Sequence, residues 1–272
     1  MELKIFDVEH GACALATCDN GNRLMIDSGH NATTNWRPGT HLRSLGALML
    51  QTLVITNYDE DHVSGLPNLL NSVFVEWLLR NPTVGAADLF ALKSEDGMGS
   101  GIQALSGVIP AFSPSSSPAP PFPDLYWHAF WNPYPAFTTE ENDLSLVLYL
   151  ALNGVTFLFP GDLERKGWLN LLTTNANFRN CVRRVDVLIA SHHGRDTGVC
   201  RELFDVYGCR PQLVVISDDY HQYDTQKTTQ YYASKASGIK GFRFDGDRTV
   251  LTTRSDGDLT FTVTSRLNCI VN

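Results

Sequence analysis

The stretch TNYDEDHVSG, Thr56 to Gly65, follows an apolar run from Leu50 to Ile55 that is typical of a buried strand. It sets three carboxylates and an imidazole side by side, from Asp59 to His62. Adjacent carboxylates repel one another unless water solvates them or a positive group neutralises them. The stretch is therefore either a solvated acidic loop or part of a cation site.

Potential metal ligands also follow two other strand-like segments. Asp162 ends the run GVTFLFPGD, and His192 and His193 end the run VDVLIASHHG. Carboxylate oxygen and imidazole nitrogen are usual ligands for zinc, manganese or iron, and loops at strand ends are where a rigid scaffold can bring them together. With the first stretch, these segments favour a site for one or two divalent metal ions, zinc or manganese.

Each segment also has a simpler interpretation. Asp162 precedes a helical pattern and is suited to be a helix N-cap. His192 and His193 are equally typical of a pair of partly buried histidines that bond to the backbone.

The composition limits the class of protein. The chain has 272 residues, of which 43% are hydrophobic, enough for one large core, so we expect a single domain over residues 1–272. A formal net charge of -8 argues against a broad basic face that wraps nucleic acid. We expect no secretory signal and no membrane association, and hence a cytoplasmic protein.

The order of elements suggests two sheets packed face to face with helices outside, because strands are followed by helices in each half of the chain. A Pro-rich insert at about 81–137 interrupts this rhythm, and we expect its aromatic residues, around 126–131, to hold it against the body. We expect a hairpin over 242–263 to close the chain.

Five segments, in order along the chain, resemble motifs of the metallo-β-lactamase-fold hydrolases, and more closely of their ComEC-like branch, found in bacterial competence proteins. They are FDVEHGACALATCDNGNRLMIDSG (6–29), TNYDEDHVSGL (56–66), ENDLSLVLYLALNGVTFLFPGDLE (141–164), DVLIASHHG (186–194), and PQLVVIS (211–217) with FRFDGDRTVLTTRSDG (242–257). The resemblance implies an α+β fold, a four-layer αββα sandwich of two mixed β-sheets, with a two-metal site between the sheet edges.

The resemblance also implies roles for individual residues. Asp61, His62 and His193 would hold one metal ion, and Asp162 would bridge to a second ion that Asp59 also serves.

Three further residues would surround the metal ions. His192 would hydrogen-bond a substrate oxyanion or a leaving group, so we take it and Asp61 as catalytic candidates. Asp27 would brace the ligand loop. Arg195 is a candidate for binding a substrate phosphate, with ordinary surface charge as the alternative.

The chain departs from the family pattern at two places. Asn57 stands where the family has its first histidine, and the YGHP motif is missing, although His221 lies near enough to substitute. Asn142 matches the asparagine of the NxxSLVL motif. We assign Asn57, Asn142 and His221 to the second metal position or its surroundings, which the departures weaken.

The predicted function is hydrolysis by a metal-activated water, with phosphodiesters or short, single-stranded nucleic acid as the favoured substrates. One alternative is a regulatory or binding subunit of a larger complex that has lost turnover. A second alternative is an ester, thioester or lactam hydrolase. In each case the insert, which contains prolines and tryptophans, would suit a protein partner.

Overall fold

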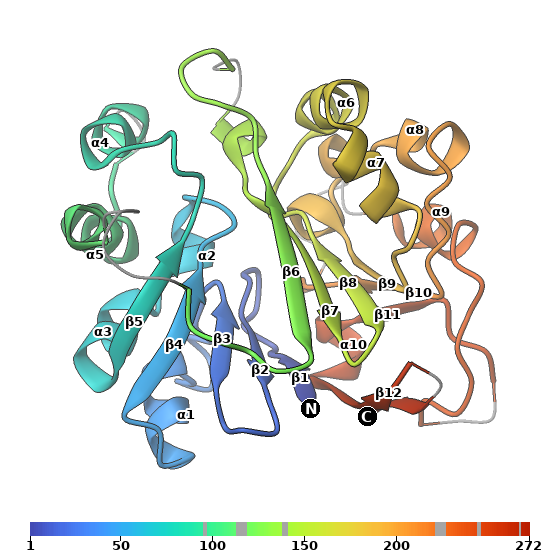
Figure 1. Ribbon diagram of the computed structural model, residues 1–272, viewed down its shortest axis with the longest axis horizontal. Coiled ribbons are helices and arrows are strands. Elements are labelled where there is room, and N and C mark those ends of the chain that lie inside the picture. The colour runs from blue at the N-terminus through green and yellow to red at the C-terminus, as the bar shows by residue number, and fades with distance from the viewer. Residues whose placement is uncertain (95–96, 113–118, 138–140, 221–226, 244–245, 267) are drawn as a thin grey trace.

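Two mixed β-sheets lie face to face in the computed structural model of the chain (Figure 1). The structure describes residues 1–94, 97–112, 119–137, 141–220, 227–243, 246–266 and 268–272.

The first sheet has the strand order β13-β12-β1-β2-β3-β4-β5. Its strands, in chain order, are β1 (Glu2–Ile5), β2 (Ala14–Thr17), β3 (Arg23–Ile26), β4 (Met49–Val54), β5 (Phe74–Leu79), β12 (Leu259–Ser265) and β13 (Asn268–Val271). The pairs β3–β4 and β4–β5 are parallel, and the other pairs are antiparallel.

The second sheet has the order β11-β10-β9-β8-β7-β6. Its strands are β6 (Leu125–Phe130), β7 (Val147–Leu152), β8 (Val155–Phe159), β9 (Val187–Ile189), β10 (Leu213–Ile216) and β11 (Val250–Thr252). Strands β8 to β11 run parallel to one another, so their C-terminal ends lie at the same edge.

Alternation along the strands divides the core into layers, because successive side chains of a strand point to opposite faces. In β3, Leu24 and Ile26 join the cluster between the sheets, whereas Met25 packs under the helices. In β8, Phe157 and Leu158 are divided in the same way between the inner cluster and the other helical layer. Both sheets are therefore apolar on both faces.

Helices cover the outer face of each sheet (Figure 1). On the first sheet they are α1 (Pro38–Ser44), α2 (Glu60–Val63), α3 (Leu66–Ser72), α4 (Ala86–Lys93), α5 (Ser100–Val108) and η1 (Ile109–Ala111). The second half contains η2 (Glu141–Leu144), α6 (Arg165–Thr174), α7 (Ala176–Val182), η3 (Ser191–Gly194), η4 (Asp196–Gly198), α8 (Arg201–Asp205), α9 (Thr229–Ala233) and α10 (Thr253–Asp256). The α+β, four-layer sandwich of two mixed sheets predicted from the sequence is confirmed.

The closing hairpin predicted over 242–263 is wrong. Strand β11 pairs with β10 in the second sheet, whereas β12 pairs with β1 in the first sheet. Between them α10 turns the chain, and Gly257 ends the turn with φ of 67°. Asp256 and Gly257 resemble a hairpin signal, but here the Asp–Gly pair changes the sheet rather than the strand direction.

The insert at about 81–137 is more than a loop. It contributes α4, α5 and the edge strand β6, which pairs antiparallel with β7. Trp127 of β6 contacts Trp77 of β5, with 5.7 Å between ring centroids, and so connects the edges of the two sheets. The aromatic segment does hold the insert to the body, but as a strand. The Pro-rich residues 113–118 lie outside the described part of the chain.

Within the described residues, no helix is both long and apolar enough to cross a bilayer.

Helix α5 packs closely on α2, and one glycine makes this possible. A Cβ atom at Gly101 would lie 2.2 Å from the Val63 carbonyl oxygen. Glu60 also accepts hydrogen bonds from the backbone N–H groups of Gly101 and Ile102 at 2.8 and 3.1 Å. The insert is thus fixed against α2, the helix inside the motif TNYDEDHVSGL.

We expect Gly101→Ala to lower the free energy of unfolding by about 1–3 kcal/mol, because the added methyl group forces α5 away from α2. Gly107 of the same helix is the matched control, since a Cβ there would meet no atom within 4 Å. Denaturant unfolding of both variants is the measurement. Equal stability of the two variants would contradict the close packing.

Candidate metal centre

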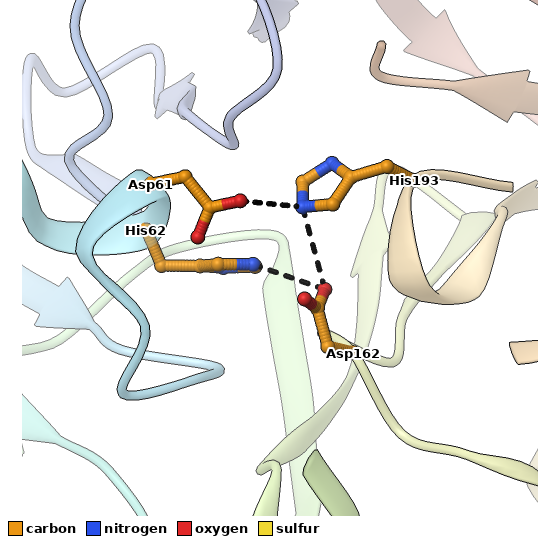
Figure 2. A group of neighbouring side chains, drawn as sticks. All are labelled: Asp61, His62, Asp162 and His193. Carbon is orange, nitrogen blue, oxygen red and sulfur yellow. Dashed lines mark hydrogen bonds and ion pairs between the residues drawn. The ribbon is translucent and has the colours of Figure 1, made fainter. Parts of the chain in front are cut away.

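Four ligand-type side chains converge from three loops: Asp61 and His62 of α2, Asp162 after β8, and His193 after β9 (Figure 2). One ligand atom from each lies within 4.8 Å of all the others. The three buried members are His62, Asp162 and His193, and Asp61 is half-buried. Three of the sequence motifs therefore meet at one place.

The loops that carry Asp162 and His193 are joined to each other by hydrogen bonds. The His192 N–H and the Ser191 hydroxyl both donate to the Gly161 carbonyl oxygen at 3.1 Å. Gly161 has φ of 58°, and a Cβ there would lie 3.0 Å from the Thr56 carbonyl oxygen, so only glycine fits this turn.

His192 and His193 are both in the left-handed backbone region, with φ of 52°. For residues other than glycine this conformation costs about 1–3 kcal/mol each. The surrounding hydrogen bonds hold the turn in a conformation that places the His193 ring against the carboxylates.

Carboxylates face both nitrogen atoms of the His62 ring. Nδ1 lies 2.9 Å from Asp27 Oδ2, and Nε2 lies 3.0 Å from Asp162 Oδ1. Asp27 itself accepts from the N–H and hydroxyl groups of Thr56 at 2.7 and 2.5 Å. Burial opposes charge on the ring, but Asp162 and Asp27 outweigh it and raise the pKa of His62 well above its usual value. Asp27 thus lies where a residue that braces the ligand loop is expected.

His193 presents one nitrogen to the same carboxylate. Its Nδ1–H donates to the Ser217 carbonyl oxygen at 2.9 Å, because a carbonyl can only accept. Its Nε2 lies 3.3 Å from Asp61 Oδ2 and 3.5 Å from Asp162 Oδ1 (Figure 2). This buried nitrogen therefore faces two carboxylates. Burial again opposes charge, and Asp162 and Asp61 raise the pKa of His193.

The donor set fits a divalent cation. If each ring of His62 and His193 carries one proton, on Nδ1, its Nε2 is a hydrogen-bond acceptor. This nitrogen would then face a carboxylate oxygen, which is also an acceptor, and the contact would be repulsive. Either an extra proton on each ring or a cation among the four groups removes the conflict. Two imidazole nitrogens and two carboxylates are a usual set for zinc or manganese.

His192 lies beside this group, with Nε2 at 4.0 Å from Asp162 Oδ2. Arg195 donates to His192 Nε2 at 3.2 Å, so Nδ1 carries the ring proton and donates to the Thr197 hydroxyl at 2.8 Å. Burial lowers the pKa of His192, and Arg195 adds to this. His192 therefore lies beside the four side chains, and its Nε2 accepts a hydrogen bond from Arg195.

Arg195 contacts a second histidine that the sequence interpretation missed. Its Nη2 donates to His10 Nε2 at 2.9 Å. The His10 and His193 rings lie 4.8 Å apart, and burial lowers the pKa of His10 to about 4. The sequence signal that could have identified His10 is its position inside the motif FDVEHG.

Asn57 is fully engaged by protein groups. Its Nδ2 donates to Asn142 Oδ1 at 3.0 Å and to Ser145 Oγ at 3.1 Å, and its Oδ1 accepts from the Asp59 N–H at 2.8 Å. The structure therefore makes Asn57 and Asn142 braces of the loop that carries Asp61.

Asp59 lies outside the group of four. Its carboxylate is in an ion pair with the Lys93 ammonium, which also pairs with Glu141. The prediction that Asp59 serves a second metal ion is thus at odds with its partner here. His221, the other residue assigned to that position, lies outside the described residues.

The simpler interpretations are partly correct. His193 does bond to the backbone, as expected for a buried histidine, but its other nitrogen faces carboxylates. Asp162 is not a helix N-cap, because α6 begins after Glu164, and it is only 3% exposed. The acidic loop is not simply solvated, since Asp59 has Lys93 and Asp61 has His193.

A cavity of about 400 Å³ opens beside the four side chains. Its walls include Asp61, Asp162, His192 and His193 together with the two cationic residues Lys93 and Arg195. The cavity thus borders three of the four candidate metal ligands and both cations.

Comparison with known proteins gives one curated relative and several solved structures. No protein-family model matches the chain. ComE operon protein 3 of Bacillus subtilis (strain 168) is 23% identical over 249 residues, which are 84% of this chain and 30% of that protein. The chain thus spans less than a third of the length of this relative.

The solved structures resemble the chain in fold. CmlA, a diiron β-hydroxylase from Streptomyces venezuelae, is 12% identical and has a TM-score of 0.53, with 96% of this chain and 54% of that chain covered. A Thermotoga maritima protein of the metallo-β-lactamase superfamily is 11% identical, with a TM-score of 0.46 over 92% of this chain and 97% of that chain. The TM-score with CmlA indicates that the two chains share a fold.

We expect metal binding to release protons, because the nearby carboxylates raise the pKa values of His62 and His193 and so favour their protonated forms in the metal-free chain. The affinity for the metal ion should fall as pH falls. It should stop rising once the pH exceeds the raised pKa values of both histidines. Calorimetric titration with zinc in buffers of different ionisation enthalpy measures the release. Asp162→Asn should abolish most of the binding, and a heat that is independent of the buffer would contradict the prediction.

Proposed function

We propose that this chain is a metal-dependent hydrolase that cleaves phosphodiester bonds, in a short or single-stranded nucleic acid or in a smaller diester. The observation that carries the proposal is the convergence of Asp61, His62, Asp162 and His193, with two imidazole nitrogens directed at one carboxylate oxygen. Two buried imidazole nitrogens that face carboxylate oxygens are typical of an ion site.

These four residues would hold one divalent ion. When bound, it would polarise a substrate oxygen and lower the pKa of water, which provides a nucleophile near neutral pH. Asp27 and the Ser217 carbonyl oxygen each fix the outer nitrogen of a ligand imidazole, so that the inner nitrogen is directed at the ion. The metal is proposed to be zinc or manganese, and the fold similarity to a diiron protein makes iron a third ion to test.

The side of the cavity that holds Arg195 suits an anionic group of a substrate. Arg195 presents a planar guanidinium in its wall, and such a group suits two oxygens of a phosphate. His192 and His10 accept hydrogen bonds from Arg195 and hold it in place. The proposed role of His192 is therefore to position Arg195 as well as to contact the substrate.

The substrate is proposed to be short because the chain as a whole is acidic. With a formal net charge of -8, the chain offers little attraction to a long duplex. A larger assembly could deliver the substrate, and the greater length of the Bacillus relative is consistent with this. Phe90 of α4 and Tyr126 of β6 are the exposed aromatic residues of the insert that such a protein partner would contact.

A specific observation favours a second candidate function. Asn57 is engaged by Asn142 and Ser145, and Asp59 is engaged by Lys93, so the second metal position is altered. A chain that binds one ion without turnover, as a regulatory subunit, would have this arrangement. A third use of the same residues is hydrolysis of an ester, thioester or lactam.

We expect the purified chain, supplied with zinc, manganese or iron(II), to cleave bis(p-nitrophenyl) phosphate or a short single-stranded DNA. Asp162→Asn should reduce the rate by about 10²-fold or more, because it removes the carboxylate that both imidazoles face. Asp205→Asn, at a half-exposed position paired with Lys235, is the control.

The same assay distinguishes the alternatives. Cleavage of a lactam, thioester or carboxylic ester without cleavage of a phosphodiester would favour the third function. Metal uptake with no cleavage of any of these substrates would favour the regulatory subunit.

We expect Arg195→Ala to raise KM for a phosphodiester by about 10-fold, because an ionic hydrogen bond to the substrate is lost. The effect on kcat should be smaller. Arg165→Ala is the matched control, since Arg165 pairs with Glu202 at an exposed position. Unchanged kinetics in the Arg195 variant would show that Arg195 is ordinary surface charge.

A further inference from the structure

Lys93 is a buried cation that the insert places in the wall of the candidate metal centre. It ends α4 and is only 6% exposed. Its ammonium pairs with the carboxylates of Asp59 and Glu141, which approach from different parts of the chain. It also lines the same cavity as Asp162 and Arg195.

A buried lysine needs such partners. Removing an ammonium group from water costs several kcal/mol unless nearby carboxylates compensate it. Burial lowers the pKa of Lys93, but Asp59 and Glu141 outweigh it and raise the pKa above its usual value. Lys93 therefore carries its positive charge in the folded protein.

The neighbours of Lys93 include a residue expected to serve a second metal ion. The Asp59 carboxylate forms an ion pair with Lys93, and the Asp59 N–H donates a hydrogen bond to Asn57 Oδ1. Asn57 in turn is committed to Asn142 and Ser145. A cation therefore already lies on the Asp59 side of the centre, and it is covalently part of the chain.

The geometry points to Lys93 as a built-in cation of this centre: its ammonium takes the place beside Asp59 that a second metal ion would need, so the chain binds one divalent ion. This inference rests on the proposed function, because it requires that Asp61, His62, Asp162 and His193 hold the first ion. Lys93 then supplies a single positive charge in the cavity wall, and this charge cannot exchange with solvent as a metal ion can.

The test is the number of metal ions bound, measured by elemental analysis after dialysis and by calorimetric titration with Mn²⁺. We expect about one equivalent for the wild-type chain. Lys93→Met keeps the aliphatic stem but leaves Asp59 and Glu141 uncompensated, so it should take up about one further equivalent, more weakly. Lys93→Arg keeps the charge and should stay at about one.

Two variants serve as controls. Lys235 is a surface lysine paired with Asp205, so Lys235→Met should bind as many ions as the wild type. Asp59→Asn in the Lys93→Met background should lose the added equivalent, because Asp59 would be one of its ligands.

The outcomes separate this inference from the proposed function. No metal on the wild-type chain would overturn both. One ion on the wild type and still one on a folded Lys93→Met would overturn the role of Lys93 and leave the proposed function standing. Two ions on the wild type would also overturn the role of Lys93.

A spectroscopic measurement decides the matter if Lys93→Met does not fold. Electron paramagnetic resonance of the wild-type chain saturated with Mn²⁺ should show isolated ions. The signal of a spin-coupled pair of Mn²⁺ ions would overturn the inference.

Discussion

The constraint on which the site depends is the meeting of two imidazole nitrogens at one buried carboxylate. Asp162 Oδ1 lies 3.0 Å from His62 Nε2 and 3.5 Å from His193 Nε2. The outer nitrogens are fixed by Asp27 and by the Ser217 carbonyl oxygen, so neither ring can turn away without losing a buried hydrogen bond. The protein therefore holds the three groups in an arrangement that is stable only with positive charge among them, as protons or as a metal ion.

The fold imposes this meeting through the ends of its strands. Strands β8 and β9 are parallel neighbours, so the loops that carry Asp162 and His193 emerge side by side. His192 and His193 both have a positive φ, a strained conformation that directs the His193 ring toward the carboxylates. The hydrogen bonds to Gly161 offset part of this strain. Strand β4 belongs to the other sheet, and packing of the two inner faces brings its loop, with Asp61 and His62, to the same place.

Apolar runs predicted the layers, and local signals placed six candidate ligands at strand ends. The family resemblance then selected five of them, and four of the five, Asp61, His62, Asp162 and His193, converge. Alternating or continuous apolar runs mark the strands, and a ligand-type residue directly after a strand must lie at a sheet edge. Lys93 and His10 left no such signal. Lys93 belongs to an insert whose helices pack through tertiary contacts rather than a recognisable motif, and His10 acts through Arg195, 185 residues away. The prediction of a closing hairpin was wrong because an Asp–Gly turn is compatible with either a hairpin or a change of sheet, and tertiary contacts decide between them.

Asn57, which stands where the family has its first histidine, and Lys93 are explained together. An amide cannot supply the imidazole nitrogen that a second ion would prefer, and Asn57 instead fixes the loop by bonds to Asn142, Ser145 and the Asp59 backbone. The half-buried carboxylate of Asp59 would then lie beside the centre with no ion to balance it, unless the chain provided a cation of its own. Lys93 provides it from α4, so the loss of a ligand in one segment and the lysine in a distant insert are complementary parts of one electrostatic arrangement.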